Sequence, residues 1–215
     1  MLKSYTAPTT LVVAGAWNPD ILSPPWVANK AMDLNLGVDF PVNAEIAIGN
    51  PTQRPTFEFH GIKFVAARNA ITFFLQPDDP AQVATSISTV GKILGLLPHT
   101  PVTGFGFNFS YEIESPSTEL IKTFDSGNLP ADFLDDEAAE SVGRHWSAKV
   151  KTRDRLLTVN SKFEGAKVLL SFNVHNEVTS AEQASHRLMA NGIFDNAKKD
   201  AKTIAEKLHA MGEEA

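Results

Sequence analysis

The sequence contains no cysteine among its 215 residues. It therefore cannot form disulfides, thiolate metal sites or a cysteine nucleophile, and this composition is typical of cytoplasmic proteins. It also lacks an apolar run near the roughly 20 residues that span a bilayer. The run over residues 11–17 resembles the core of a secretion signal, but Asn18 and Pro19 close it, so we interpret it as a buried strand. We expect a soluble, cytoplasmic protein.

Motifs that carry chemistry are missing as well. The sequence has no G-x-S-x-G nucleophile elbow and no G-x-x-x-x-G-K-[ST] phosphate loop. Gly104 and Gly106 begin a G-x-G motif, but the third glycine that precedes a helix is absent. None of the six histidines has the i, i+4 spacing of a metal-ligand pair on a helix. We therefore expect no catalytic residue, no cofactor and no metal.

Positive charge is scarce. The chain has 19 lysines and arginines against 25 acidic residues, which gives a net charge of -6 and a pI near 5.5. Because contacts to phosphates need clustered Lys and Arg, nucleic acid is not expected to be the main partner. A local basic patch is still compatible with this charge balance.

Within residues 101–114, ten residues alternate strictly between apolar and small or polar side chains. Phe105, Phe107, Phe109, Tyr111 and Ile113 fall on one side. Successive side chains of a strand point to opposite faces. A slip of one residue would expose all five apolar side chains, each worth roughly 1.5–3 kcal/mol when buried. The pattern predicts a central strand with a fixed register.

Residues 57–75 predict a three-stranded antiparallel meander. Two-residue turns at residues 60–61 and 69–70 direct the apolar side chains to one face and place an acid opposite a base. The opposite pairs that these turns predict are Phe57 with Phe64, Glu58 with Lys63, and Phe73 with Ala66.

A second meander is predicted over residues 145–178. Turns at residues 153–154 and 164–165 again give one apolar inner face, and they leave a polar outer face. The opposite pairs that these turns predict are Val150 with Leu157, Val159 with Leu170, and Ser161 with Val168.

Three segments have helical patterns. Ser23 before Pro24 predicts a short helix over residues 24–32. Asp79 before Pro80 opens an amphipathic helix that ends near residue 97. A capping box over residues 179–182 opens a helical region that extends to about residue 211, and Asn191–Gly192 divides it into two helices.

One further strand is expected at an edge of the sheet. Residues 38–48 alternate, with Val38, Phe40, Val42, Ala44, Ile46 and Ile48 on one face. Pro41 cannot donate a hydrogen bond to a neighbouring strand, so this segment should lie at an edge or leave its Pro41 position unpaired.

These elements predict an α+β fold. Antiparallel meanders form one large sheet or two adjoining sheets, and helices pack on one face. We expect a single domain over residues 1–215, with an internal division into 1–114 and 141–215 as an alternative. Residues 115–140, which are rich in acids, would then be the connector.

Two groups of residues are candidate binding sites. Trp17, Asn18 and Trp26 bracket a turn after the first buried strand, and loops at strand ends often carry function. The alternative is that both indoles only close the edge of the core. The outer face of the second meander carries Lys149, Lys162 and Lys167, which could contact an acidic partner or simply face solvent.

The order of elements resembles an uncharacterised, sporadically distributed family of bacterial proteins. The resemblance rests on the helix over residues 83–97 that leads into GFGFNFSYEIE, on the closing pattern VLLSFNVHNEV, and on the helices with Arg187–Leu188 and Ile193–Phe194–Asp195 that follow. It implies a bacterial or phage-related origin and an unassigned role, and it transfers no functional residue.

Two functions from different classes are compatible with these observations. The first is a non-catalytic interaction or assembly module, such as a homodimer that pairs through a sheet edge or a helix. The alternative is a small-ligand-binding protein or enzyme with its pocket between sheet and helices near Trp17 and Trp26. A third hypothesis, nucleic-acid contact through the lysine face, predicts binding that weakens steeply with salt.

Overall fold

The computed structural model describes residues 2–4, 7–34, 40–46, 54–118, 120–122, 147–152, 155–164 and 167–210. The chain folds into two compact units that are interleaved along the sequence. Unit 1 comprises residues 1–8, 106–176 and 194–215, and unit 2 comprises residues 9–105 and 177–193. Most of the expected connector over residues 115–140 lies outside the described residues.

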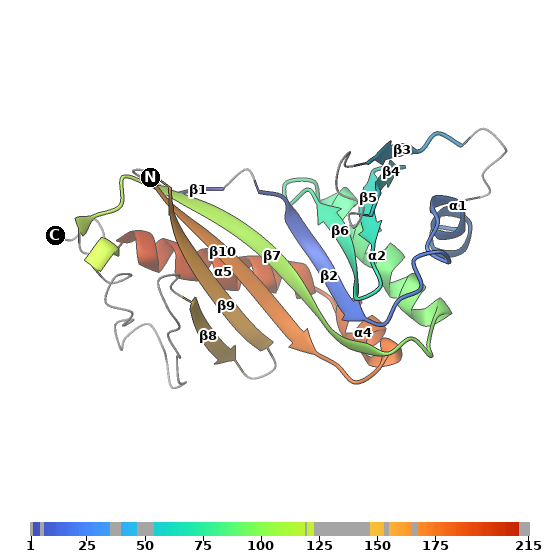
Figure 1. Ribbon diagram of the computed structural model, residues 1–215. Helices are drawn as coiled ribbons and strands as arrows, with labels where there is room; N and C mark the ends of the chain where they lie inside the picture. Colours follow the sequence, from blue (N-terminus) through green and yellow to red (C-terminus); the bar gives the residue numbers. More distant parts are fainter. Residues whose placement is uncertain are drawn as a thin grey trace. The chain divides into compact units, whose positions relative to one another are not determined.

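Unit 2 contains an antiparallel set of strands with β3 at its outer end (Figure 1). Their hydrogen-bonded order is β3-β4-β5-β6-β2, and the next strand in the order is β7. The bounds are β2 Thr9–Gly15, β3 Asn43–Glu45, β4 Thr56–Phe59, β5 Ile62–Ala66, β6 Ala70–Leu75 and β7 Val102–Glu114.

The helices of unit 2 are α1 Pro24–Trp26, the π-helical turn η1 Val27–Ala31, α2 Pro80–Leu96 and α4 Ala181–Leu188. Asp79 caps α2 by accepting hydrogen bonds from the backbone N–H groups of Ala81 and Gln82. α2 packs against α4 at Gly91, whose carbonyl accepts a 2.9 Å hydrogen bond from Ser185 Oγ. A Cβ atom at Gly91 would lie 2.6 Å from Met189 Sδ, so the glycine makes room for the residue that follows α4.

Unit 1 contains the remainder of β7, followed in order by β10 Lys167–Glu177, β9 Arg155–Glu164 and β8 Ser147–Thr152. The short strand β1 Leu2–Ser4 pairs with β7. Helix α5 Ile193–Ala210 packs on the strands of this unit (Figure 1), and Phe194 from α5 contacts the rings of Phe107 and Phe109. The α+β class and the antiparallel sheet are as predicted.

The strand over residues 101–114 is confirmed as β7. Its five predicted inner side chains, from Phe105 to Ile113, are all buried. Its first residues lie in unit 2 and those from Gly106 onward in unit 1, so one continuous strand contributes to both units.

Two of the predicted hairpin registers are wrong by two residues. Phe73 lies opposite Phe64 instead of Ala66, so the turn falls at residues 68–69. Val159 lies opposite Phe172 instead of Leu170, and Glu164 faces Lys167. The pairs predicted for the turns at residues 60–61 and 153–154 are confirmed. A shift of two keeps the same face inward, which is why the predicted faces remain correct.

Two element boundaries also differ. Of the strand expected over residues 38–48, only Asn43–Glu45 is a strand among the described residues, although it does lie at the edge. The cap of α4 is Ser180, which accepts from the N–H of Gln183, so the helix is capped one residue later than predicted. The short helix expected over residues 24–32 is present, and it continues beyond Trp26 to Ala31 as a π-helix.

Within the described residues, no helix combines the length and the apolar character that crossing a bilayer requires.

Candidate functional site

A continuous apolar row crosses the sheet of unit 2. It consists of Leu11, Phe73, Phe64, Phe57 and Ala44, each of which lies directly opposite the next on the neighbouring strand. Residues that face each other across a ladder share one face of the sheet. The first three are almost completely buried, Phe57 is half-buried, and Ala44 is exposed. Burial therefore falls steadily towards the β3 edge.

The position of α2 explains this gradient. The helix packs on β5 and β6, and the buried side chain of Gln82 ties it to the latter. Gln82 Nε2 donates to the carbonyl of Phe74 at 3.1 Å, and its Oε1 accepts from the N–H of Gln76 at 3.0 Å. The apolar face of the sheet thus extends beyond the strands that carry this helix.

The outer end of this face is here called the β3 margin, defined as Val42, the three residues of β3, and Ile46. The side chain of Ile46 is 70% exposed. Alternation places Val42 and Ile46 on the same face as Ala44, because all three are two residues apart. The margin is therefore an apolar stripe along β3 and the residues next to it, in which Val42 is half-buried and the described part of the chain leaves Ala44 and Ile46 exposed.

The chain before the margin, and the margin itself, make contacts that anchor them. Phe40 contacts the ring of Phe59 edge-on at 5.0 Å between centroids and stacks on His60 at 5.7 Å. His60 and Gly61 both have positive φ, which gives the tight turn its geometry. On the other face of the sheet, Lys63 Nζ lies 2.6 Å from Glu45 Oε1 and over the ring of Phe74. This ion pair compensates the charge of Glu45.

A second feature of unit 2 is an open hollow of about 350 Å³ at the end of β2. Two large apolar side chains in its wall are exposed, Ile21 at 39% and Leu96 at 46%. The complete lining is Ala16, Asn18, Ile21, Leu96, Leu97, Pro98, His99, Thr100 and Pro101. The hollow is mainly apolar with a few polar groups, which is the usual character of a small-ligand site.

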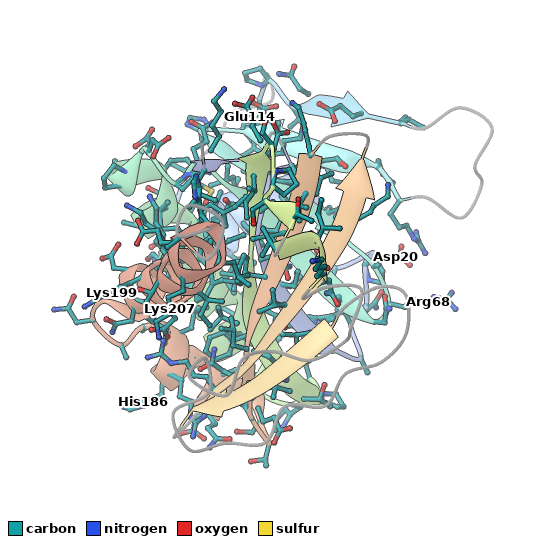
Figure 2. The ribbon with its side chains drawn as sticks, turned by 90° about the vertical axis from the view of Figure 1, so that its left-hand side faces the viewer. Asp20, Arg68, Glu114, His186, Lys199 and Lys207 are labelled. Atoms are coloured by element: carbon teal, nitrogen blue, oxygen red, sulfur yellow. The ribbon has the colours of Figure 1, made fainter. Side chains whose placement is uncertain are left out.

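Backbone hydrogen bonds fix the wall of the hollow around Trp17. The N–H of Ala16 donates to the carbonyl of Pro101, and the N–H of Trp17 donates to the carbonyl of Arg68, both at 2.8 Å. Asn18 Oδ1 accepts from the N–H of Asp20, which closes an Asx turn. The side chains of Asp20 and Arg68 point outward (Figure 2).

The structure places the three residues predicted for this region, Trp17, Asn18 and Trp26, in different surroundings. Asn18 lines the hollow, but neither tryptophan belongs to the lining that the described residues form. Trp17 is buried, and its Nε1 donates to the carbonyl of Val13 at 3.1 Å. Trp26 is half-buried at the end of α1, where the chain enters the π-helix. Trp17 therefore closes the core, as the structural alternative expected.

The lysine face of unit 1 carries mixed charge. Lys167 Nζ lies 2.6 Å from Glu112 Oε1 and 4.0 Å from Glu114 Oε1, and Lys3 pairs with Glu114 at 3.0 Å. The hydrogen bond from Lys3 lowers the pKa of Glu114, which stands at the end of β7 (Figure 2). The acids of β7 thus balance Lys167.

Of the other two predicted lysines, Lys162 is exposed and lies opposite Leu169 of β10. Lys149 belongs to β8, where its backbone lies opposite Thr158 of β9. Among the described residues, the lysine face therefore carries both positive and negative charges. It is less suited to binding nucleic acid than its lysines alone would suggest.

Sequence reasoning missed two things that the structure adds. The exposure of the β3 margin had no signal, because a long apolar alternation with a proline marks an edge strand but does not show what covers its apolar face. The wall formed by residues 96–101 had no signal in the sequence either, since only folding brings the end of α2 beside the end of β2.

Among the described residues, no group of three or more His, Asp or Glu side chains is placed to hold a metal ion. No protein-family model and no curated protein matches the sequence, so the resemblance to a bacterial family stays a prediction.

Proposed function

We propose that this protein is a non-catalytic interaction module that assembles with a second copy of itself through the β3 margin. The observation that carries the proposal is the uncovered apolar stripe along the edge strand β3, where Ile46, the residue that follows β3, is 70% exposed. Edge strands present unpaired backbone N–H and C=O groups, which readily accept another strand.

The size of the margin sets the expected strength of assembly. Burial of one isoleucine side chain contributes roughly 1.5–3 kcal/mol. Stable interfaces bury about 1,200–2,000 Å² in total, which is more than a three-residue strand and its flanks provide. We therefore expect a weak dimer whose population depends on protein concentration.

Sedimentation equilibrium over a wide concentration range tests the proposal. The monomer of 23.4 kDa should convert to a species of twice that mass as concentration rises. Ile46→Asp should abolish the conversion, because it places a charge in the interface. Ile21→Asp is the matched control, since Ile21 is also an exposed apolar side chain but lies in the hollow. A monomer at every concentration would refute the proposal.

The hollow supports a second candidate function, the binding of a small apolar ligand. Ile21 and Leu96 expose apolar surface towards a space of about 350 Å³, and Asn18 offers a polar contact at the wall. The apolar dye anilinonaphthalene sulfonate serves as the probe. Its fluorescence should rise on binding to the native protein, and Leu96→Asp should remove the rise while Ile46→Asp leaves it unchanged. Equal fluorescence with Leu96→Asp would exclude the hollow as the site.

We also propose a cytoplasmic location and a bacterial origin. The cysteine-free composition supports the location, and the pattern of elements supports the origin. Protein is the proposed partner, in preference to membrane or nucleic acid. Retention of the protein on heparin in a salt-dependent manner would count against this preference.

A further inference from the structure

We infer that two copies pair their β3 strands antiparallel about a two-fold axis through Ala44. The inference rests on the proposed self-assembly and adds the partner strand, its direction and its register. Two-fold dimers are the commonest homo-oligomers, and their interfaces must be self-complementary. The β3 margin satisfies this condition in one register.

The faces of the two strands restrict the registers. In an antiparallel pair, residues directly opposite each other lie on the same face. The apolar positions of the margin are Val42, Ala44 and Ile46, and Ala44 lies on the face of Phe57 by its register with β4. A pairing that continues the apolar face must therefore oppose these positions with one another and not with Asn43 or Glu45.

Charge then selects among the registers that remain. An axis through Glu45 would set the two Glu45 carboxylates opposite each other, and like charges directly opposite are destabilising. An axis through Asn43 would leave Ile46 beyond the paired strand residues. With the axis through Ala44, Asn43 faces Glu45 of the second copy, so an amide meets a carboxylate.

The same axis covers the exposed isoleucine. It sets Val42 opposite Ile46 of the second copy, and it sets the two Ala44 residues opposite each other. All three residues of β3 then face strand residues, and the 70% exposed side chain of Ile46 gains an apolar neighbour. Lys63 still compensates Glu45 from within each copy, at 2.6 Å.

Disulfide trapping tests this register. Because the chain has no native cysteine, any disulfide must form between the introduced residues. Directly opposed residues of antiparallel strands have Cα atoms within the 4.4–6.8 Å that a disulfide requires. Single variants Ala44→Cys, Asn43→Cys and Glu45→Cys are oxidised with oxidised glutathione, and covalent dimer is measured on non-reducing gels. Ala44→Cys should give on the order of tenfold more covalent dimer than either neighbour.

A mixture of Asn43→Cys and Glu45→Cys provides the second arm. The mixture should crosslink between the two variants, although neither crosslinks efficiently with itself. All three positions are exposed, and circular dichroism verifies that each variant folds.

The outcomes separate the inference from the proposed function. If sedimentation shows a dimer but Glu45→Cys or Asn43→Cys self-crosslinks better than Ala44→Cys, the register is wrong and the assembly stands. If sedimentation shows no dimer at any concentration, the proposed function and the inference both fail. A dimer that no single variant or mixture traps would place the interface elsewhere, and it would overturn both the inference and the assembly through the β3 margin on which it rests.

Discussion

Gly15, at the end of β2, has no room for a side chain. A Cβ atom at this position would lie 2.5 Å from the backbone oxygen of Pro101 and 3.2 Å from Trp17 Nε1. The Pro101 oxygen is itself held by the N–H of Ala16 at 2.8 Å. Because backbone cannot give way cheaply, the end of β2 and the start of β7 would have to separate.

We therefore expect Gly15→Ala to lower the free energy of unfolding by roughly 1–3 kcal/mol. Urea denaturation measures the change. Gly95→Ala is the control, since a Cβ there has no neighbour within 4 Å. Alanine in helix α2 should instead stabilise by about 0.5–1 kcal/mol. Equal effects of the two substitutions would contradict the steric explanation.

Tyr111 is a buried residue whose ionisation should be visible in solution. Burial, and to a smaller extent the negative charge of Glu206, raises the pKa of Tyr111 from 10.0 to about 12. Its ring packs edge-on against Phe172. In the variant Tyr5→Phe, Tyr111 is the sole tyrosine of the chain. The ultraviolet absorbance of its phenolate should then appear near pH 12 for as long as the protein stays folded.

The same shift predicts a stability change with a definite sign. The folded state holds the phenol proton more tightly than the unfolded state, so the contribution to stability is full below pH 10 and is lost as the pH rises towards 12. The loss should be roughly 1–3 kcal/mol. Tyr111→Phe should remove this pH dependence between 10 and 12, as denaturation at several pH values would reveal. An unchanged slope would show that other groups cause it.

Helix α2 is the element that covers the inner part of the apolar row, and its start depends on one side chain. Asp79 Oδ1 accepts from Ala81 N–H at 3.1 Å and from Gln82 N–H at 3.0 Å. Removal of an N-cap typically costs about 1 kcal/mol. We expect this loss for Asp79→Ala and a much smaller one for Asp79→Asn, which keeps an accepting oxygen. Thermal denaturation compares the two, and identical losses would mean that the charge matters more than the cap.

The strands show what a sequence pattern can and cannot specify. Alternation has a period of two, so it identifies the inner face of a strand but not a shift of two along its partner. The turn at His60 and Gly61 was predicted correctly because both residues adopt the positive φ that a tight turn needs. The turn before β6 has no glycine, and its pattern fits two registers equally well.

The edge strand shows a different limit. The apolar alternation of residues 38–48 predicted a strand at an edge, and β3 does lie there. How much of its apolar face is covered depends on where α2 packs, which is a tertiary property. The exposure of Ile46 therefore could not be predicted from the strand itself. The hollow likewise could not be predicted from the sequence, since its walls come from segments about 80 residues apart.

Lys199 and Lys207 project from α5 on the side away from its buried residues (Figure 2), while Phe194, Ala197, Ala201 and Leu208 are buried. Among the described residues of unit 1, no large apolar side chain is exposed, whereas the apolar face of unit 2 continues uncovered to Ile46. The two units thus differ in how fully the described residues cover their own sheet.

At the level of the whole molecule, the proposed assembly through the β3 margin predicts that stability depends on concentration. A second copy that binds only the folded chain stabilises it by mass action. The thermal midpoint of the native protein should therefore rise as its concentration increases across the range in which sedimentation detects the dimer. The thermal midpoint of Ile46→Asp should not change with concentration, because the substitution removes association. It should stay close to the midpoint of the native protein at its lowest concentration, since residue 46 is exposed in the monomer and the substitution causes no strain there. Scanning calorimetry at several concentrations measures both. If the midpoints of the two proteins depend on concentration in the same way, association does not use the β3 margin. Something other than a second copy would then have to cover the apolar face of unit 2.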